Sequence, residues 1–160
     1  MSPCAPEAVV TSVLEIKQIC FDGGTQPRAE LRQALVEEYA AAMRDGAQFP
    51  PIVVFGGGSD YWAADGFHRA GACKLEGLSG IRAEVRQGTR RDAVLYSVGA
   101  NGSHGWRRTS ADKRRAVQTL LADAEWSQWS SREIAARCVV SHRIVDDLRR
   151  TAGYRSQLRA

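Results

Sequence analysis

The chain has 160 residues, and its 22 Lys and Arg against 18 Asp and Glu give a formal net charge of +4. That length holds one large domain or two small ones, and a hydrophobic share of 44% with no apolar run near ~20 residues excludes a membrane-spanning or wholly disordered chain. Residues 1–100 hold 10 basic and 12 acidic side chains, whereas residues 101–160 hold 12 basic and 6 acidic. We therefore expect a polyanionic partner to bind the last third.

The first twenty residues lack the basic start and the uninterrupted apolar stretch of a secretory signal, which favours a cytoplasmic protein without membrane insertion. The four cysteines lie far apart, with neither a C-x-x-C pair nor zinc-ligand spacing. Such spacing is typical of free thiols in a reducing compartment.

Alternating patterns predict a small sheet after a loose segment at residues 1–11. Polar and apolar residues alternate over Val13–Ile19, which predicts a strand, and a glycine-rich turn separates 52–55 from 61–64, which predicts a β-hairpin. Residues 81–86 alternate again and return to the sheet. Helices are expected at 28–44, 70–76 and 90–98, the first with a stripe of Leu31, Leu35, Tyr39 and Met43. Together, residues 12–108 predict an α+β domain with a mixed sheet.

Only helical patterns follow, and residues 109–160 are predicted to form a second, all-α domain. Thr109 and Asp112 have the spacing of a capping box, and two short helices are expected at 131–138 and 141–150. Trp126 and Trp129 lie in the connection before these two helices, and they either pack in the core or stack on exposed bases.

Two glycine-containing segments carry the chemistry. Asp65-Gly66-Phe67-His68-Arg69 joins a strand to a helix, where glycine admits a ligand to the backbone and a helix start offers N–H groups to phosphate; a plain turn is the alternative. In the segment 101–109, Asn101 could help to hold Mg²⁺, and His104, Arg107 and Arg108 could bind phosphate, although paired arginines are also common on solvated surfaces.

These two segments, with Gln26-Pro27-Arg28 and the strand and helix order over roughly residues 12–110, resemble the ParB/sulfiredoxin-like fold. The resemblance implies a nucleotide pocket for an NTP, CTP or ATP, with Mg²⁺ as cofactor. The residues implied to bind nucleotide are Gly66, Phe67, His68, Arg69, Asn101, His104, Arg107 and Arg108, with Asn101 also implied as the Mg²⁺ ligand.

Three positions depart from the family pattern. Phe67 stands where sulfiredoxins have their catalytic cysteine, which excludes sulfiredoxin activity. His68 replaces the first arginine of the ParB box, and Ala100 replaces a glutamate that many ParB proteins have. The loss of that carboxylate favours nucleotide binding over hydrolysis.

Residues 131–145 resemble a helix-turn-helix, with Ile134, Val140, Val145 and Leu148 as the expected buried set. Val139 stands where that motif usually has a glycine in a left-handed turn. A packing hairpin without DNA contact is the alternative. The residues expected to contact DNA are Arg132, Ser141, His142, Arg143, Arg149 and Arg150.

The sequence therefore predicts a DNA-binding protein with a ParB-like nucleotide pocket, acting in plasmid or phage maintenance, partition or regulation, and able to form a homodimer. One alternative is a Mg²⁺-dependent DNase or ATPase of the same superfamily, such as a plasmid factor that inhibits conjugation, with Asp65, His68, Arg69 and His104 as catalytic residues. Another is an interaction module that keeps the fold without a ligand.

Overall fold

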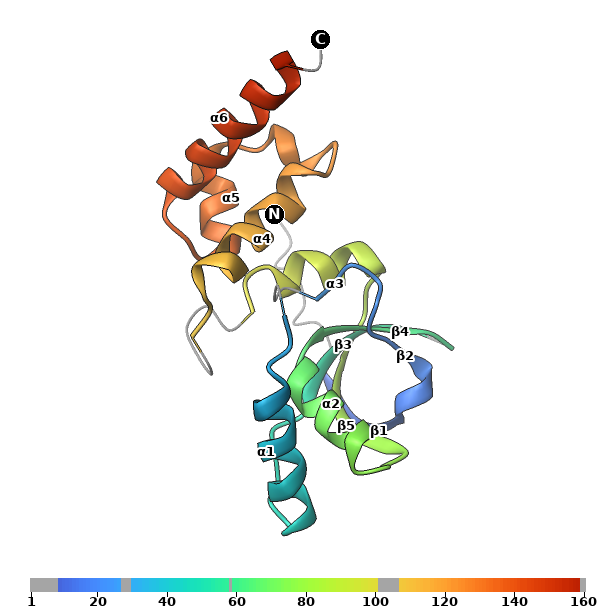
Figure 1. Ribbon diagram of the computed structural model, residues 1–160. Helices are drawn as coiled ribbons and strands as arrows, with labels where there is room; N and C mark the ends of the chain where they lie inside the picture. The colour runs from blue at the N-terminus through green and yellow to red at the C-terminus, as the bar shows by residue number, and fades with distance from the viewer. Residues whose placement is uncertain (1–8, 27–29, 58, 101–106, 159–160) are drawn as a thin grey trace. The chain divides into compact units, whose positions relative to one another are not determined.

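The computed structural model describes residues 9–26, 30–57, 59–100 and 107–158 (Figure 1). They divide into two compact units, one ending at Ser97 and the other beginning at Val98. The sequence places this boundary later, between residues 108 and 109. The first unit contains the sheet and the second is helical, and each is described by itself below.

The first unit is built on a five-stranded mixed sheet with the order β1-β5-β3-β4-β2. β5 lies between β1, to which it is antiparallel, and β3, to which it is parallel. β3 and β4 form the predicted antiparallel hairpin, and β2 pairs parallel with β4. The strands are β1 (Val10–Glu15), β2 (Ile19–Cys20), β3 (Ile52–Gly56), β4 (Tyr61–Asp65) and β5 (Gly80–Arg86).

The prediction of one strand over Val13–Ile19 is wrong. A 3₁₀ turn, η1 (Ile16–Gln18), separates β1 from β2, and these two strands occupy opposite edges of the sheet. Three residues at about 2 Å each cover only about 6 Å, so the two edges lie close together and the sheet is curled, as Figure 1 shows. The backbone N–H of Ile16 donates to the carbonyl of Ser79 over 2.9 Å and holds the turn in place.

Both faces of the sheet are covered by helices. Ile52 and Val54 of β3 join the core that contains Phe67, whereas Val53 and Phe55 pack with Ala93 on the other face. Because both faces are buried, β3 is a continuous apolar run rather than an alternating one. α2 (Phe67–Leu75) contributes to the first core, α3 (Arg90–Ser97) to the second, and α1 (Gln33–Arg44) packs on α2.

Two of these helices begin elsewhere than predicted. α1 begins at Gln33 rather than near residue 28, so that Leu31 lies before it with 43% of its surface exposed. α2 begins at Phe67 rather than Ala70, because the chain turns into the helix directly after Gly66. α3 and β5 lie within one residue of the predicted bounds.

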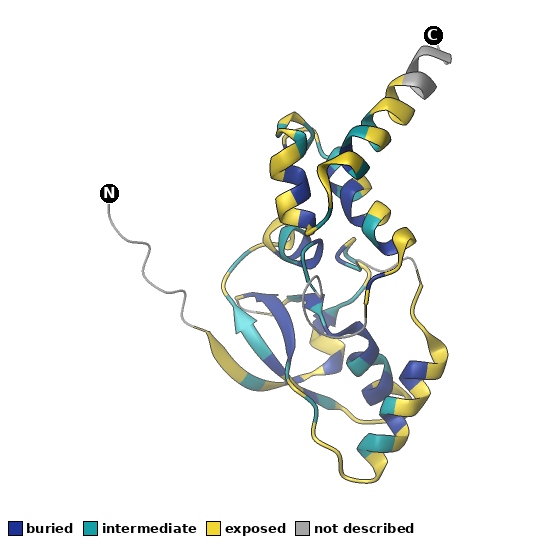
Figure 2. Ribbon diagram, turned by 90° about the vertical axis from the view of Figure 1, so that its left-hand side faces the viewer, coloured by how far each residue is buried: buried dark blue, intermediate teal, exposed yellow. Residues whose placement is uncertain are grey.

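The second unit packs three helices around a small apolar core. α4 (Ser110–Leu121) begins with the predicted capping box, in which Thr109 N–H donates to Asp112 over 2.8 Å and Asp112 N–H donates to Thr109 Oγ1 over 3.1 Å. η2 (Trp126–Gln128), α5 (Ser131–Cys138) and α6 (His142–Leu158) follow. The buried side chains, dark blue in Figure 2, include Val117, Leu120, Trp126, Ile134, Cys138 and Val145.

Candidate functional site

Gly66 connects β4 to α2 in a conformation that favours glycine. Its φ is +95°, in the left-handed region, and a Cβ there would stand 2.4 Å from Ile52 Cγ2. Because the chain turns directly from strand to helix at this residue, Phe67, His68 and Arg69 form the first turn of α2. Gly66, the N-cap residue, has no side chain to cap this helix start, so its N–H groups and positive dipole end are suited to an anion.

Arg69 is anchored within the first unit. Its Nη1 donates to the carbonyl oxygens of Pro50 and Pro51 over 2.7 and 2.8 Å, and its Nη2 lies 3.2 Å from Asp65 Oδ2. The side chains of Arg69 and Asp65 are only 17% and 20% exposed. The structure thus brings Asp65 and Arg69 together as an ion pair, while the bonds to Pro50 and Pro51 tie α2 to the chain entering β3.

His68 and Phe67 also have partners inside this unit. His68 is 9% exposed, and its Nε2 accepts a hydrogen bond of 3.1 Å from the N–H of Arg32, at the start of α1. Phe67 is 8% exposed and lies edge-on to Phe21, with the ring centroids 6.1 Å apart. A ligand at this junction would therefore meet the backbone of Phe67 rather than its ring.

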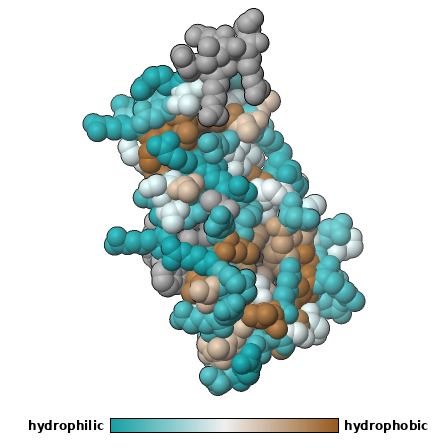
Figure 3. All heavy atoms as spheres, in the orientation of Figure 1, coloured by the Kyte–Doolittle hydropathy of each residue, from teal (hydrophilic) through white to brown (hydrophobic). Residues whose placement is uncertain are grey.

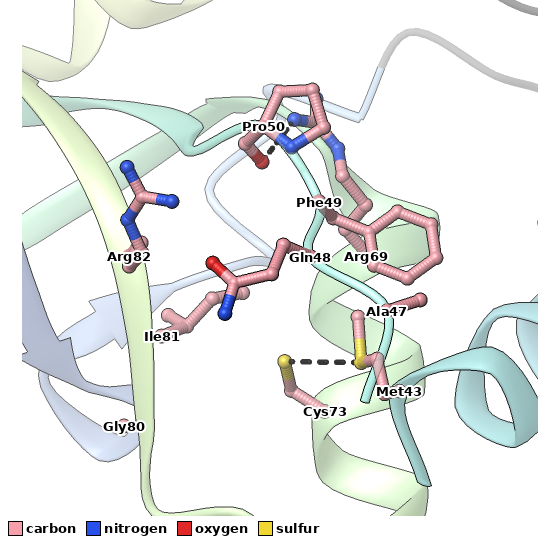
Figure 4. Close-up of a pocket in the computed structure, with 10 residues that line it drawn as sticks. All are labelled: Met43, Ala47, Gln48, Phe49, Pro50, Arg69, Cys73, Gly80, Ile81 and Arg82. Carbon is pink, nitrogen blue, oxygen red and sulfur yellow. Dashed lines mark hydrogen bonds between the residues drawn. The ribbon is translucent and has the colours of Figure 1, made fainter. Parts of the chain in front are cut away.

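A pocket of about 200 Å³ lies beside α2 (Figure 4). Arg69 and Cys73 of α2 line it together with Arg82 of β5, and Gln48 reaches across it. Burial raises the pKa of the Cys73 thiol, whose Sγ lies 3.7 Å from Met43 Sδ. A buried, protonated thiol is not a ready nucleophile, so this wall of the pocket acts as an apolar surface beside two guanidinium groups.

The segment 101–109 is described only from Arg107 onward. Asn101, with its predicted Mg²⁺, and His104 lie outside the described residues. Arg107 is exposed, whereas Arg108 is 8% exposed. Arg108 Nη1 donates to the carbonyl of Val98 over 2.9 Å, and Nη2 donates to those of Cys138 and Val139 over 2.6 and 3.0 Å. These bonds commit Arg108 to contacts within the second unit.

Cys138 lies at the end of α5 with no exposed surface. Burial raises the pKa of its thiol to about 12, although the charge of Arg108 acts in the opposite direction. The three described cysteines, Cys20, Cys73 and Cys138, are free thiols, as predicted for those positions.

We expect this thiol to make the protein less stable as the pH rises above about 9. The folded state keeps the proton that the unfolded chain releases, so the free energy of unfolding falls by up to about 1.4 kcal/mol per pH unit from this group. Urea unfolding of the wild type and of Cys138→Ala between pH 7.5 and 10 measures it. Equal slopes in the two proteins would contradict the assignment.

The α5–α6 segment has the geometry of two helices joined by a left-handed turn. Val139 has φ +52°, and Ser130 caps α5 by accepting the N–H of Glu133 over 3.1 Å. Ile134 and Val145 are fully buried between the helices, whereas Val140 and Leu148 are partly exposed. Ser141, directly before α6, and His142 and Arg143, in its first turn, are exposed.

The other arginines predicted to contact DNA differ in their surroundings. Arg132 is exposed, and Arg150 is exposed but lies 3.3 Å from Asp147. Arg149 is partly buried, and its Nη2 donates to the carbonyls of Ser127 and Trp129. Trp126 is buried, as one of the two alternatives predicts, and Trp129 lies under Arg137 with 5.3 Å from guanidinium carbon to ring centroid.

A basic stretch on α4 was missed by the reasoning from sequence. Arg114 and Arg115 are exposed and Lys113 is partly exposed, whereas Ala116 and Val117 are buried. The signal was available, because three consecutive basic residues precede the buried residues of this helix. On the face drawn in Figure 3, hydrophilic side chains are interspersed with hydrophobic ones.

The described residues contain neither a candidate metal-binding cluster nor a candidate membrane-spanning helix. Within the described residues, no three His, Cys, Asp or Glu side chains lie close enough to hold a metal ion. Over the same residues, no helix combines the length and the apolar character that a bilayer crossing requires.

Known proteins resemble the chain over most of its length. A curated relative, "Streptomycin biosynthesis operon possible regulatory protein" of Streptomyces griseus, is 32% identical over 114 residues, which cover 71% of this chain and 31% of that protein. The chain thus spans about a third of the length of this relative.

Solved structures of the C-terminally truncated chromosome-partitioning protein ParB from Caulobacter crescentus share the fold. The structure complexed to the centromeric parS site has a TM-score of 0.55 at 17% identity, covering 84% of this chain and 68% of that one. The structure complexed with CTP-gamma-S has a TM-score of 0.52 at 17% identity, covering 85% and 74%. They confirm the predicted α+β class. The protein-family model for the ParB N-terminal domain matches residues 5–102, which is more than half of the chain. The chain therefore belongs to the ParB N-terminal domain family.

Proposed function

We propose that the chain is a DNA-binding regulatory protein in which α6 reads duplex DNA and the β4–α2 junction binds nucleotide phosphates. The observation that carries the DNA assignment is the first turn of α6. His142 and Arg143 are exposed there, as is Ser141 directly before the helix, while Ile134 of α5 and Val145 of α6 are buried. A helix held in this way can enter the major groove with its N-terminal side chains toward base edges.

The relatives support both halves of the proposal. One is titled as a possible regulatory protein, and a ParB protein of the same fold was crystallised with parS DNA and with CTP-gamma-S. In this chain, exposed arginines of α4, α5 and α6 would contact DNA phosphates, and Arg143 would contact bases. Arg149 is not included, because its guanidinium is bonded to backbone carbonyls.

For the nucleotide, the start of α2 supplies backbone N–H groups at Phe67 and His68. Arg69 would act mainly by holding the start of α2. Asp65 is paired with Arg69, so no hydrolytic role is assigned to its carboxylate.

We expect Arg143→Ala to weaken specific DNA binding by about 10–100-fold and to affect non-specific binding far less, because a base contact is worth about 1–3 kcal/mol. A duplex enriched from a random library by the wild type, and a scrambled duplex of the same composition, provide the two measurements by fluorescence anisotropy. Arg82→Ala, an exposed arginine of the first unit, is the matched control. Equal losses on both duplexes would refute the base-reading assignment.

Calorimetry with CTP, ATP and GTP, each with Mg²⁺ and with and without the enriched duplex, tests the nucleotide half. At least one nucleotide is expected to bind, because the backbone N–H groups at the start of α2 can donate to its phosphates. If none binds under any condition, the nucleotide assignment fails and the DNA assignment stands by itself.

A further inference from the structure

The turn between α5 and α6 is held in a conformation that its own sequence does not favour. Val139, with φ +52°, is the sole non-glycine residue at positive φ in the described part of the chain. A β-branched side chain is strained in the left-handed region, which glycine usually occupies at a helix end. The backbone closes the turn with bonds from Val139 N–H to the Ala136 carbonyl and from Val140 N–H to the Ala135 carbonyl, and a further contact from outside the turn can add stabilisation.

Arg108 supplies that stabilisation. Its Nη2 donates to the carbonyls of Cys138 and Val139, the last residue of α5 and the turn residue itself, while Nη1 donates to Val98. Carbonyls at the C-terminus of a helix lack helical N–H partners and carry the negative end of its dipole, so a guanidinium is well matched to them. Because Arg108 is 8% exposed, water does not readily replace these bonds.

The geometry of this turn sets the direction of α6. Only Val140 and Ser141 separate Val139 from the first residue of the helix, His142. A change of backbone angles at Val139 would rotate the first turn of α6 against α5, and with it the exposed side chains of Ser141 and Arg143. Ile134 and Val145 are both buried, but two apolar side chains do not by themselves define that rotation.

We propose that Arg108 is a positioning residue for DNA recognition, which fixes the left-handed α5–α6 turn and thereby aims α6 without touching DNA. The inference rests on the proposed function, because it concerns how α6 reads DNA. It assigns a different role to the two neighbouring arginines. Arg107 faces solvent and is available to a ligand, whereas Arg108 acts through the backbone of residues 138 and 139.

The test compares discrimination, meaning the affinity for the library-enriched duplex divided by that for the scrambled duplex. Arg108→Met and Arg108→Lys are expected to lower this ratio at least about tenfold, since a misaimed helix loses base contacts and keeps phosphate contacts. Lysine keeps the charge, but one ammonium cannot span Val98 and the turn. Val117→Ala, a cavity variant in α4 of the same unit, is the control for general destabilisation. Binding is measured at 10 °C, with circular dichroism to establish that each variant is folded.

A rescue separates positioning from general stability. Val139→Gly removes the strain at the turn, and is expected to restore most of the lost ratio in the Arg108→Lys background. The proposal is overturned if a folded Arg108 variant keeps the wild-type ratio, if Val117→Ala loses as much, or if Val139→Gly restores nothing. If the wild type enriches no duplex at all, the proposed function itself fails. Urea unfolding of the wild type, Arg108→Lys, Val139→Gly and the double variant then still tests the contact between Arg108 and the turn. If the two substitutions change the free energy of unfolding additively, Arg108 does not stabilise the turn.

Discussion

Gly66→Ala is expected to lower the free energy of unfolding by about 3 kcal/mol or more. Two costs combine at this position. Alanine is disfavoured at φ +95°, and its Cβ would stand 2.4 Å from Cγ2 and 2.8 Å from Cβ of Ile52. Ile52 is 1% exposed in the middle of the sheet, so it has no space into which to move.

Gly46→Ala is the matched control for this variant. Gly46 has nearly the same φ, +90°, but a Cβ there would meet no atom within 4 Å. We therefore expect Gly46→Ala to cost only about 1 kcal/mol, the conformational part of the penalty. Urea unfolding of the three proteins measures both values. A cost at Gly66 no larger than that at Gly46 would show that β3 yields to the added methyl group.

Raising the salt concentration from about 50 to 200 mM is expected to weaken DNA binding by roughly a thousandfold. This effect depends on the number of phosphates that the second unit neutralises. If six of its basic side chains contact phosphates, the slope of log K against log salt is about −5. The exposed or partly exposed candidates on the described helices and just before them are Arg107, Lys113, Arg114, Arg115, Arg132, Arg137, Arg143 and Arg150.

Single variants divide that slope among residues. Arg114→Ala is expected to make it less negative by about one unit on the enriched and the scrambled duplex alike, because a phosphate contact carries no sequence information. Arg82→Ala, on β5 of the other unit, leaves the slope unchanged. A wild-type slope near zero would contradict electrostatic binding by these helices, whatever the fate of the individual variants.

Local patterns in the sequence predicted most of the elements. The hairpin of β3 and β4, the return of β5, the capping box at Thr109 and the bounds of α5 all depend on neighbours within a few residues, and the structure confirms them. At Val139 the sequence left two outcomes open, a strained left-handed turn or a different turn, and the structure has the left-handed one. Hydrophobic periodicity and capping residues are therefore sufficient to predict an element that is determined by its own residues.

Contacts between distant residues account for the differences. The alternating pattern from β1 to β2 predicts one strand, but the two halves of this segment pair at opposite edges of the sheet. Arg107 and Arg108 are indistinguishable as a pair of adjacent arginines, and only the carbonyls of Val98, Cys138 and Val139 separate their environments. The candidate site residues Asp65 and Arg69 could be placed near each other by their spacing, but the bonds of Arg69 to Pro50 and Pro51 could not.

The position of β1 has a consequence for the order in which the protein is made. Its ladder partner is β5, with Val10 opposite Val85 and Glu15 opposite Gly80, so the strand of this unit that is synthesised first waits for almost the last element of the unit. Until then its backbone groups are available to other chains. The sheet is therefore expected to close late and in a single slow step, governed by this long-range pairing rather than by its helices. In nascent chains that stop before residue 80, β1 would lack its partner β5 and could pair with strands of other chains.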